Sequence, residues 1–267
     1  MHPYRRFERF LVCWENNIKT MFDPIFKDNY CVRKADSLEE VRMAQKLRYE
    51  VFNVELGEGL ESSLEDQRDK DPFDIHCDHL IVEHLPEQTI VGTYRVQTGQ
   101  RAAEGIGYYS AQEFDLTPYE KYRHKILELG RACVHVDHRK QKVLKLLWRG
   151  IARYAFANKS RYLIGCSSLT SQSSGEGWAL YHKIKEDYMV SKKFQTMPLP
   201  DYQLDPESGE PVEVKCPRLF AAYLGLGARI AGPPAIDRAF KTIDFFTLFD
   251  FKKVRKTGAL DFIKKND

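Results

Sequence analysis

The order of the apolar segments is the feature of this sequence that most limits its fold. Ser37 and Glu40 have the spacing of a capping box, and apolar residues behind them repeat at helical spacing, so we expect a helix over 38–54. Two strand-like segments, 79–83 and 89–96, flank a turn and predict a hairpin. The later segments are a strand at 125–136, a helix at 143–157, a strand at 162–166, a helix at 177–185, a helix at 217–227 and a strand at 243–251. This order predicts an α/β fold, in which a mixed sheet carries helices on both faces.

The sequence predicts one large domain with a basic segment at each end. A chain of 267 residues is long enough for one large domain or two small ones, and we expect the domain to cover 35–250. Residues 1–34 combine basic and aromatic side chains and are expected to form an arm or helix, and residues 251–267 a basic tail. No stretch approaches the roughly 18 apolar residues of a transmembrane helix, and the N-terminus lacks the apolar core of a signal peptide. We therefore expect a cytoplasmic protein.

The charges nearly balance overall but are separated along the sequence. There are 41 Lys and Arg residues against 38 Asp and Glu residues, a net charge of +3. Residues 55–74 contain eight acidic and two basic side chains, whereas residues 139–161 contain eight basic side chains and no acidic one. A basic stretch of this kind attracts an acidic partner. No motif of a nucleic-acid-binding protein accompanies it, so we expect an acidic protein partner and no nucleic acid.

Neither the cysteines nor the histidines have the spacing of a metal site. The six cysteines are far apart and include no CxxC pair, so free thiols are expected. The short clusters at 76–79 and 135–138 have no partner pair at zinc-finger spacing. Each also begins or ends a predicted strand, where alternate residues face opposite ways. We therefore predict no metal and no bound cofactor.

Seven charged or aromatic residues stand in an informative order between the first helix and the long central strand. They are Arg48, Phe52, Asp71, Asp74, Arg95, Glu128 and Arg131. In this order they resemble the signature of the acyl-homoserine-lactone synthases, GNAT-like enzymes that take acyl chains from acyl carrier protein. Over 35–250 the chain looks closer to the ornithine-lipid N-acyltransferases and haemolysin-like acyltransferases, because 128–135, 146–150 and 161–166 also match. The resemblance implies a GNAT-like mixed sheet that is splayed between its central strands.

The connection after the central strand departs from the ordinary GNAT pattern. Residues 139–145 contain no glycine, whereas the pyrophosphate-binding loop of GNAT enzymes uses glycines to bring backbone amides close to phosphates. The sequence therefore favours acyl-phosphopantetheine on acyl carrier protein over acyl-CoA as the donor. The residues expected to dock this acidic carrier are Arg139, Lys140, Lys142, Lys145 and Arg149.

An N-acyl transfer needs a base for the amine, donors for the oxyanion and a stabilised thiolate. Glu128 is the candidate base. Its structural alternative is a salt bridge with Arg131, which needs a bulge at Gly130 to bring both residues to one face. Tyr181 resembles the helix tyrosine that many GNAT enzymes use as the leaving-group acid, with a packed tyrosine as the alternative. The predicted catalytic set is Glu128, Arg131 and Tyr181.

A cationic amino acid such as ornithine needs carboxylates for its side-chain amine and an arginine for its own carboxylate. Asp71 and Asp74 are the candidate carboxylates, with a capped turn at Asp71 as the alternative. Backbone amides between Cys133 and His135 are the candidate oxyanion donors. The predicted substrate-binding set is Arg48, Phe52, Asp71, Asp74, Arg95, Cys133 and His135, and Arg131 is a further candidate for the carboxylate.

Together these features predict an N-acyltransferase. It would move a fatty or 3-hydroxy-fatty acyl chain from acyl carrier protein to the α-amino group of an amino acid, with ornithine favoured, and release a lyso-ornithine lipid. Two alternatives share the scaffold: an acyl-homoserine-lactone-type synthase, and an N-acyl amino acid synthase for glycine or tyrosine. A non-enzymatic alternative is a haemolysin-like membrane-binding protein. The basic, aromatic ends could lie on an anionic membrane surface, with the protein at the inner face of the membrane.

Overall fold

The computed structural model describes residues 22–139, 141–206 and 213–254. In these residues the strands are β1 (Ile25–Lys27), β2 (Tyr30–Lys34), β3 (Asp78–His84), β4 (Thr89–Thr98), β5 (Ile126–Val134), β6 (Tyr162–Leu169), β7 (Arg229–Ile230), β8 (Ala235–Asp237) and β9 (Thr242–Asp250). The α-helices are α2 (Leu38–Tyr49), α3 (Gly99–Glu104), α4 (Gln141–Ala157), α5 (Ser174–Tyr188), α6 (Arg218–Leu226) and α7 (Phe251–Val254). A π-helical turn, Glu50–Glu55, extends α2 to the predicted length. No helix in the described ranges is long and apolar enough to cross a membrane.

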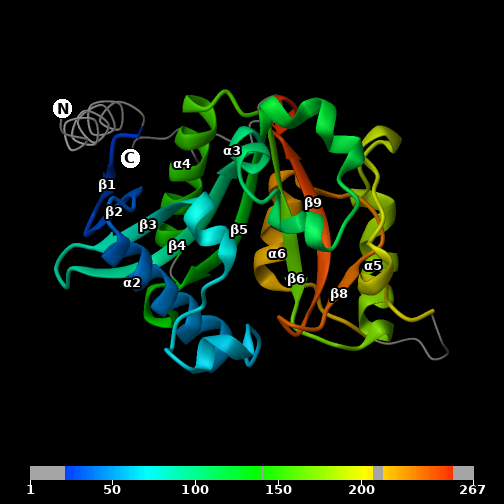
Figure 1. Ribbon diagram of the computed structural model, residues 1–267, viewed down its shortest axis with the longest axis horizontal. Helices are drawn as coiled ribbons and strands as arrows, with labels where there is room; N and C mark the ends of the chain where they lie inside the picture. The colour runs from blue at the N-terminus through cyan, green and yellow to red at the C-terminus, as the bar shows by residue number, and fades with distance from the viewer. Residues whose placement is uncertain (1–21, 140, 207–212, 255–267) are drawn as a thin grey trace, which may run out of the picture.

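The described strands form one mixed sheet, as the sequence predicts. Its order is β1-β2-β3-β4-β5-β6-β9-β7, with β8 paired to β9. Figure 1 shows two halves, with β1 to β5 on the left and β6, β8 and β9 on the right. The sequence does not predict β1 and β2, and β2 pairs antiparallel with β3. The sheet therefore begins within the segment 1–34 that is expected to be an arm or helix; its residues 1–21 lie outside the described ranges.

Helices cover both faces of the first half of the sheet, as predicted. Tyr94 and Val96 of β4 belong to the same buried core as Leu147 of α4. Arg95, between them, points to the opposite face and bonds to Asp74, which in turn is bound by the last turn of α2. Alternate residues of one strand thus separate an apolar layer under α4 from a charged layer under α2.

The sheet opens between β5 and β6, which confirms the predicted GNAT-like splay. The two strands are parallel and pair only over three residues, from Ile126↔Tyr162 to Glu128↔Ile164. At the next residue of β6, Gly165, a Cβ atom would lie 2.3 Å from the carbonyl oxygen of Leu129. Glycine is therefore required at the point where the strands begin to separate. Beyond it, β6 stays paired with β9 while β5 stays paired with β4.

A β-bulge bends β5 at the start of the gap. Arg95 of β4 pairs with Gly130, and Thr93 pairs with Cys133, so β5 has one residue more than β4 between these two pairs. Arg131 in the bulge has φ 52°, in the left-handed region that costs a non-glycine residue roughly 1–2 kcal/mol. The predicted bulge at Gly130 is confirmed, and it turns Arg131 onto the α2 face, where Glu128 also lies.

Candidate active site

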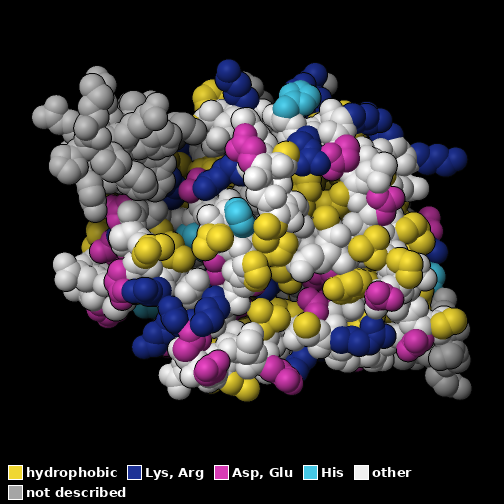
Figure 2. All heavy atoms as spheres, viewed as in Figure 1, with side chains coloured by type: hydrophobic (Ala, Val, Ile, Leu, Met, Phe, Trp, Pro, Cys, Tyr) yellow, Lys and Arg dark blue, Asp and Glu magenta, His cyan; other side chains and the backbone are white. Residues whose placement is uncertain are grey.

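A cavity of about 580 Å³ lies where β5 and β6 separate. On the α4 side its wall is apolar and includes Leu129 of β5, Leu147 of α4 and Tyr223 of α6. On the α2 side its wall carries charges, among them Arg131 and Asp244. Figure 2 shows apolar side chains near the middle of this face, over the gap between the two halves of the sheet. The cavity therefore reaches both faces of the sheet and offers an apolar wall and a charged wall to one ligand.

A closed ring of six buried charges lies beside the cavity; we call it the charge ring. Its members, in order, are Arg48, Asp74, Arg95, Asp71, Arg131 and Asp69. Arg48 of α2 binds both carboxylate oxygens of Asp74 at 3.0 and 2.8 Å, and its Nε lies 3.1 Å from Asp69 Oδ2. The side chains of Arg48 and Asp69 are 0% exposed. Burial by itself would raise the pKa of Asp74, but the charges of Arg48 and Arg95 outweigh it and hold that pKa below its usual range.

Two more arginines close the charge ring on the side of the cavity. Arg95 Nη1 lies 2.6 Å from Asp71 Oδ1 and 3.0 Å from Asp74 Oδ1. Arg131 Nη2 lies 3.0 Å from Asp71 Oδ2, and its Nε lies 3.1 Å from Asp69 Oδ2. Each aspartate therefore faces two guanidinium groups, and each guanidinium faces two carboxylates. These pairs also restrain the left-handed backbone of Arg131.

The charge ring argues against the prediction that Asp71 and Asp74 are ligands of a cationic substrate. Neither residue lines the cavity, and both carboxylates are neutralised by arginines of the protein itself. Asp71 accepts from the backbone N–H of Phe73 at 2.8 Å and, with Asp74, forms a capping box, so the alternative of a capped turn is the observed structure. The arrangement assigns the two aspartates to holding arginines in place. Arg48 is fully buried away from the cavity, while Arg95 and Arg131 line it.

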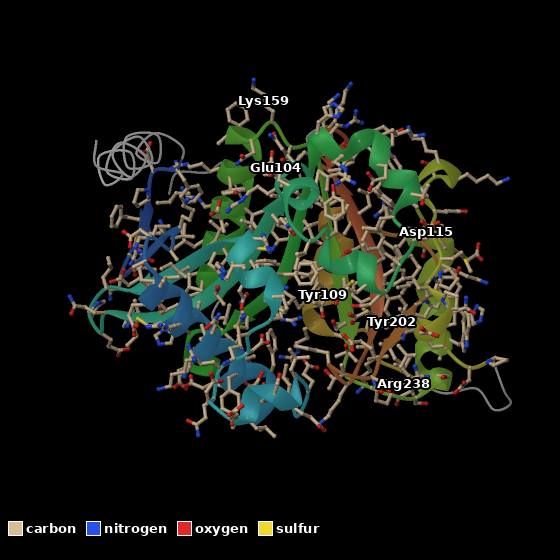
Figure 3. All side chains as sticks on the ribbon, viewed as in Figure 1. Glu104, Tyr109, Asp115, Lys159, Tyr202 and Arg238 are labelled. Carbon is tan, nitrogen blue, oxygen red and sulfur yellow. The ribbon has the colours of Figure 1, made fainter. Side chains whose placement is uncertain are left out.

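Glu128 is not placed as a base that touches substrate. It does not line the cavity, and it is 4% exposed. Its Oε2 accepts from the backbone N–H of Tyr109 at 2.8 Å, and its Oε1 accepts from the N–H and hydroxyl of Ser110, each at 2.8 Å. The structural alternative, a salt bridge between Glu128 and Arg131, is absent as well. Burial raises the pKa of Glu128, with the bonds from Ser110 acting against it. Glu128 therefore fixes the turn that carries Tyr109, which lies between the halves of the sheet (Figure 3).

Two further predicted residues lie away from the cavity. Tyr181 of α5 packs against Trp178 and His182, with ring centroids 5.9 and 5.6 Å away, so the packed alternative describes it. His135 does not line the cavity, and its backbone N–H donates to the carbonyl of Val91 at 2.9 Å. The His135 amide is therefore already used and does not serve as an oxyanion donor.

Several predicted residues do meet at the cavity. Phe52 lines it and contacts Phe240 edge-to-face, at 5.3 Å between ring centroids. Arg131 also packs against Phe240, with its guanidinium carbon 4.4 Å from the centroid of the Phe240 ring. Cys133 and Arg139 also line the cavity. The resemblance thus identifies residues of the cavity wall on the side of α2 and β5.

Two acidic residues of the cavity wall are absent from the predicted set. Glu58, from the acidic segment 55–74, is 6% exposed and accepts from Thr170 Oγ1 at 2.7 Å. Burial raises its pKa to about 7. Asp244 of β9 is 4% exposed, and burial raises its pKa to about 6. Asp244 had a visible signal in the sequence, because it is an acid directly between the apolar residues Ile243 and Phe245. Glu58 had none beyond its acidic neighbours.

The basic stretch 139–161 presents less unpaired positive charge than its sequence indicates. Arg139 forms a bidentate pair with Glu55, one bond of which is 2.5 Å, and Lys142 Nζ lies 2.7 Å from Asp28 Oδ2. Lys145 is exposed and Arg149 is half-buried. Lys140 lies outside the described residues. Acids distant in sequence therefore offset part of the charge, although Arg139 still borders the cavity.

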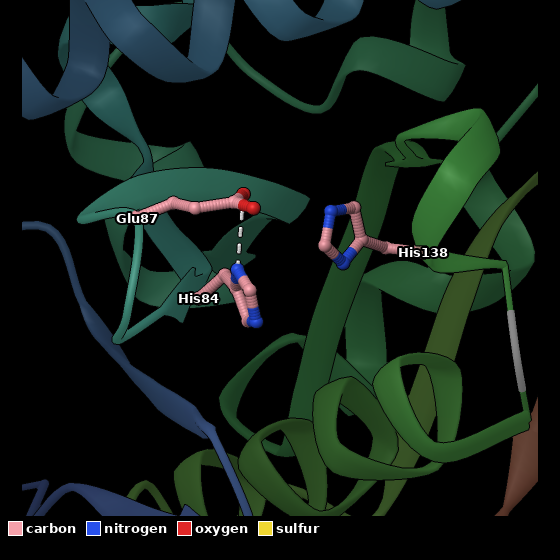
Figure 4. Close-up of side chains that lie close together, drawn as sticks. All are labelled: His84, Glu87 and His138. Carbon is pink, nitrogen blue, oxygen red and sulfur yellow. Dashed lines mark ion pairs between the residues drawn. The ribbon is translucent and has the colours of Figure 1, made fainter.

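Two clusters of side chains in the described residues have the donor types of a metal site. His84, Glu87 and His138 bring their ligand atoms within 4.8 Å of one another, with His84 Nδ1 3.0 Å from Glu87 Oε2 (Figure 4). The Glu87 side chain is 61% exposed, and His138 Nδ1 is 3.0 Å from the Tyr30 hydroxyl. Glu113, Cys166 and Asp244 form a second, buried cluster. Only the second cluster borders the cavity, through Cys166 and Asp244.

Comparison with known proteins identifies the family of this chain. Residues 47–149 match the family model of an acetyltransferase (GNAT) domain. Among solved structures, the acyl-homoserine-lactone synthase LasI aligns with a TM-score of 0.48 and 13% identity over 84% of this chain and 91% of that one. The chain is 33% identical to the L-ornithine N(alpha)-acyltransferase of Brucella abortus (strain 2308) over 84% of this chain and 85% of that protein. It is also 33% identical to the L-ornithine N(alpha)-acyltransferase of Rhodobacter capsulatus, over 83% of this chain and 90% of that protein. The protein is thus an acyltransferase of GNAT fold and belongs to the family of the L-ornithine N(alpha)-acyltransferases.

Proposed function

We propose that the protein transfers a fatty or 3-hydroxy-fatty acyl chain from acyl carrier protein to the α-amino group of ornithine and releases a lyso-ornithine lipid. The observation that carries this proposal is the cavity in the gap between β5 and β6, which has an apolar wall for an acyl chain and a charged wall for an amino acid. The names of the relatives point to ornithine as the acceptor.

The reaction exchanges one bond for another at the thioester carbonyl. The amine nitrogen forms a bond to the carbonyl carbon, and the bond from that carbon to the sulfur breaks. Ornithine enters with an α-ammonium group, which loses one proton to a base before attack and a second as the amide forms. The second proton ends on the sulfur, so the products are an amide and a free thiol. The protein must therefore supply one base near the amine.

Glu58 is the base that this proposal assigns. It lines the cavity, and Thr170 holds one of its oxygens while the other has no hydrogen-bond donor among the described residues. A carboxylate whose pKa is about 7 can accept a proton from an ammonium group and is still partly ionised at neutral pH. Arg95 and Arg131, which line the same cavity, are the candidates for the acceptor's carboxylate.

Exchanging each of two glutamates tests this assignment. Glu58→Gln should lower kcat by at least about 10²-fold, because the amide cannot accept the proton. Glu128→Gln is the matched control, since it makes the same change in a carboxylate outside the cavity and should lower kcat far less. If Glu128→Gln abolishes turnover of the folded protein while Glu58→Gln is active, the base is assigned to the wrong residue.

The donor is proposed to be acyl carrier protein because the connection 139–145 has no glycine and Arg139 borders the cavity. A double charge reversal, Lys142→Glu with Lys145→Glu, should raise KM for the acyl-carrier donor. It should leave KM for acyl-CoA nearly unchanged, because the small donor does not need the protein contact. Lys159→Glu, beyond the other end of α4 (Figure 3), is the control. Equal changes for both donors would contradict docking at this surface.

Membrane contact at the inner face is part of the same proposal, because the product is a lipid. Its proposed anchors are the basic ends of the chain, of which residues 1–21 and 255–267 lie outside the described ranges. Deleting residues 1–14 should reduce sedimentation with anionic vesicles and leave acyl transfer in solution intact. Unchanged sedimentation would place membrane contact elsewhere.

The most direct test of the function is the lipid extract of cells that overproduce the protein. Mass spectrometry should show a new amide-linked lipid with an ornithine head group. A homoserine lactone, N-acyl glycine or N-acyl tyrosine in its place would refute the ornithine assignment, and no new acylated product would refute acyl transfer to amino acids in these cells.

A further inference from the structure

Two buried carboxylates without a cation among the described residues lie at the charged wall of the cavity: Asp244 lines it, and Glu113, which does not, brings an oxygen within 4.8 Å of Asp244. Asp244 of β9 is 4% exposed and Glu113, which follows the 3₁₀ turn Tyr109–Gln112, is 1% exposed. Asp244 Oδ1 and Glu113 Oε1 each have no hydrogen-bond partner. In the part of the chain that the structure describes, no Lys, Arg or His forms an ion pair with either residue, and Asp244 faces the cavity. A buried carboxylate without a partner is unfavourable unless a ligand completes it.

The neighbouring charge ring shows that the lack of a cationic partner is particular to Asp244 and Glu113. The protein supplies three arginines to the neighbouring aspartates of the ring, and those six charges balance one another. Among these arginines, Arg131 is the one whose charge acts on Glu113. Its N–H donors, however, are directed to Asp69 and Asp71. The pair at Asp244 therefore keeps a negative potential that faces the cavity, beside the balanced charges of the ring.

We propose that Asp244 and Glu113 bind the side-chain ammonium group of the acceptor amino acid and so select acceptors with a cationic side chain. This inference rests on the proposed function and adds the residues that recognise the acceptor. Burial raises the pKa values of both carboxyl groups, because their negative charge is unfavourable without a cation beside them, and an ammonium group would supply that cation. Arg131 lies on the same cavity and can receive the acceptor's carboxylate, which leaves the α-amine near Glu58.

An ammonium group fits this pair better than a metal ion does. Cys166 completes the cluster, but its thiol pKa is raised by burial and by Glu113, which opposes the thiolate that a transition metal needs. The thiol instead serves as a neutral donor, with Sγ 3.6 Å from Ser110 Oγ and 3.9 Å from Glu113 Oε2. Ammonium needs only acceptors, and the two unpartnered carboxylate oxygens provide them.

The test compares ornithine with norvaline, which has the same carbon chain without the terminal amine. In wild type, kcat/KM should be much higher for ornithine than for norvaline. Asp244→Asn should lower kcat/KM for ornithine at least about 30-fold and leave the value for norvaline nearly unchanged, because only ornithine loses a charge partner. Glu113→Gln should act in the same direction. Asp250→Asn, on the same strand but paired with Arg161 outside the cavity, is the control and should preserve the preference.

Binding measured by calorimetry separates this inference from the proposed function. If wild type binds ornithine more tightly than norvaline and Asp244→Asn removes the difference, the inference holds even where no acyl transfer is detected, and the proposed function alone fails. Acylation of ornithine with an unchanged preference in folded Asp244→Asn would overturn the inference alone. Retention of one equivalent of zinc by wild type, lost in Asp244→Asn, would also overturn it, because the cluster would then be a metal site.

Discussion

Replacing Asp244 with Asn should stabilise the folded protein at alkaline pH, although it removes a residue that we assign to substrate binding. Burial raises the pKa of Asp244 from 3.8 to about 6, so the folded protein holds a proton that the unfolded chain has lost between these values. Wild-type stability contributed by this group is therefore greatest below pH 3.8 and falls as the pH rises to about 6. At about 1.4 kcal/mol per unit, the ionised carboxylate costs roughly 3 kcal/mol at pH 8 and about half of that at pH 5.

Urea unfolding of wild type and Asp244→Asn at pH 5 and pH 8 measures this cost. The change in unfolding free energy caused by the substitution should be more favourable at pH 8 by roughly 1–2 kcal/mol, because an amide does not titrate. Comparing the two pH values cancels any packing difference between the amide and the acid. Asp250→Asn should instead destabilise the protein by the same amount at both pH values, since Arg161 helps to hold the pKa of Asp250 below its usual value of 3.8 and the carboxylate is ionised at both. An effect of Asp244→Asn that is the same at both pH values would refute the reasoning.

Three further predictions follow from the same geometry. Glu128→Ala leaves two buried backbone N–H groups without an acceptor and should lower the free energy of unfolding by about 3 kcal/mol in urea titrations; a loss below about 1 kcal/mol would contradict it. Gly165→Ala places a Cβ against the Leu129 carbonyl and should lower the melting temperature, whereas Gly225→Ala, with no atom within 4 Å, should not. The kcat/KM of wild type should fall below about pH 7, because Glu58 must lose its proton to act as a base, and a flat profile from pH 6 to 8 would argue against that role.

Sequence patterns predict the parts of this protein that local chemistry determines. The Ser37 half of the capping box before α2 forms as expected, with Ser37 accepting from the N–H of Glu40, whereas the Glu40 side chain accepts from the N–H of Asp36 and not from that of Ser37. The bulge at Gly130 and the splay of the sheet follow from the strand order and the resemblance. β1 and β2 are missed because strands of three and five residues carry little pattern of their own and depend on pairing with β3.

The cavity wall is predicted only in part, for a physical reason. Phe52 and Arg131 are found because they stand in a recognisable order on elements that are clear in the sequence. The environment of Glu58 depends on Thr170, 112 residues away, and that of Glu113 on Asp244, which another strand brings close. Burial of this kind, rather than residue type, raises their pKa values, and a single sequence does not contain it.

The charge ring also limits what a shared signature says about a protein. Its six members join four parts of the chain into one rigid wall: α2, β4, β5 and the segment that precedes β3. Each of their charges is paired with another charge of the ring. The acceptor's carboxylate, which we assign to Arg95 and Arg131 of the ring, is common to all amino acids. A search keyed to these residues therefore groups enzymes by scaffold and does not distinguish the side chains of their acceptors. To sort such enzymes by the amino acid they acylate, or to redesign one for a new acceptor, the positions to compare are those opposite the ring, on β9 and on the turn that Glu128 holds.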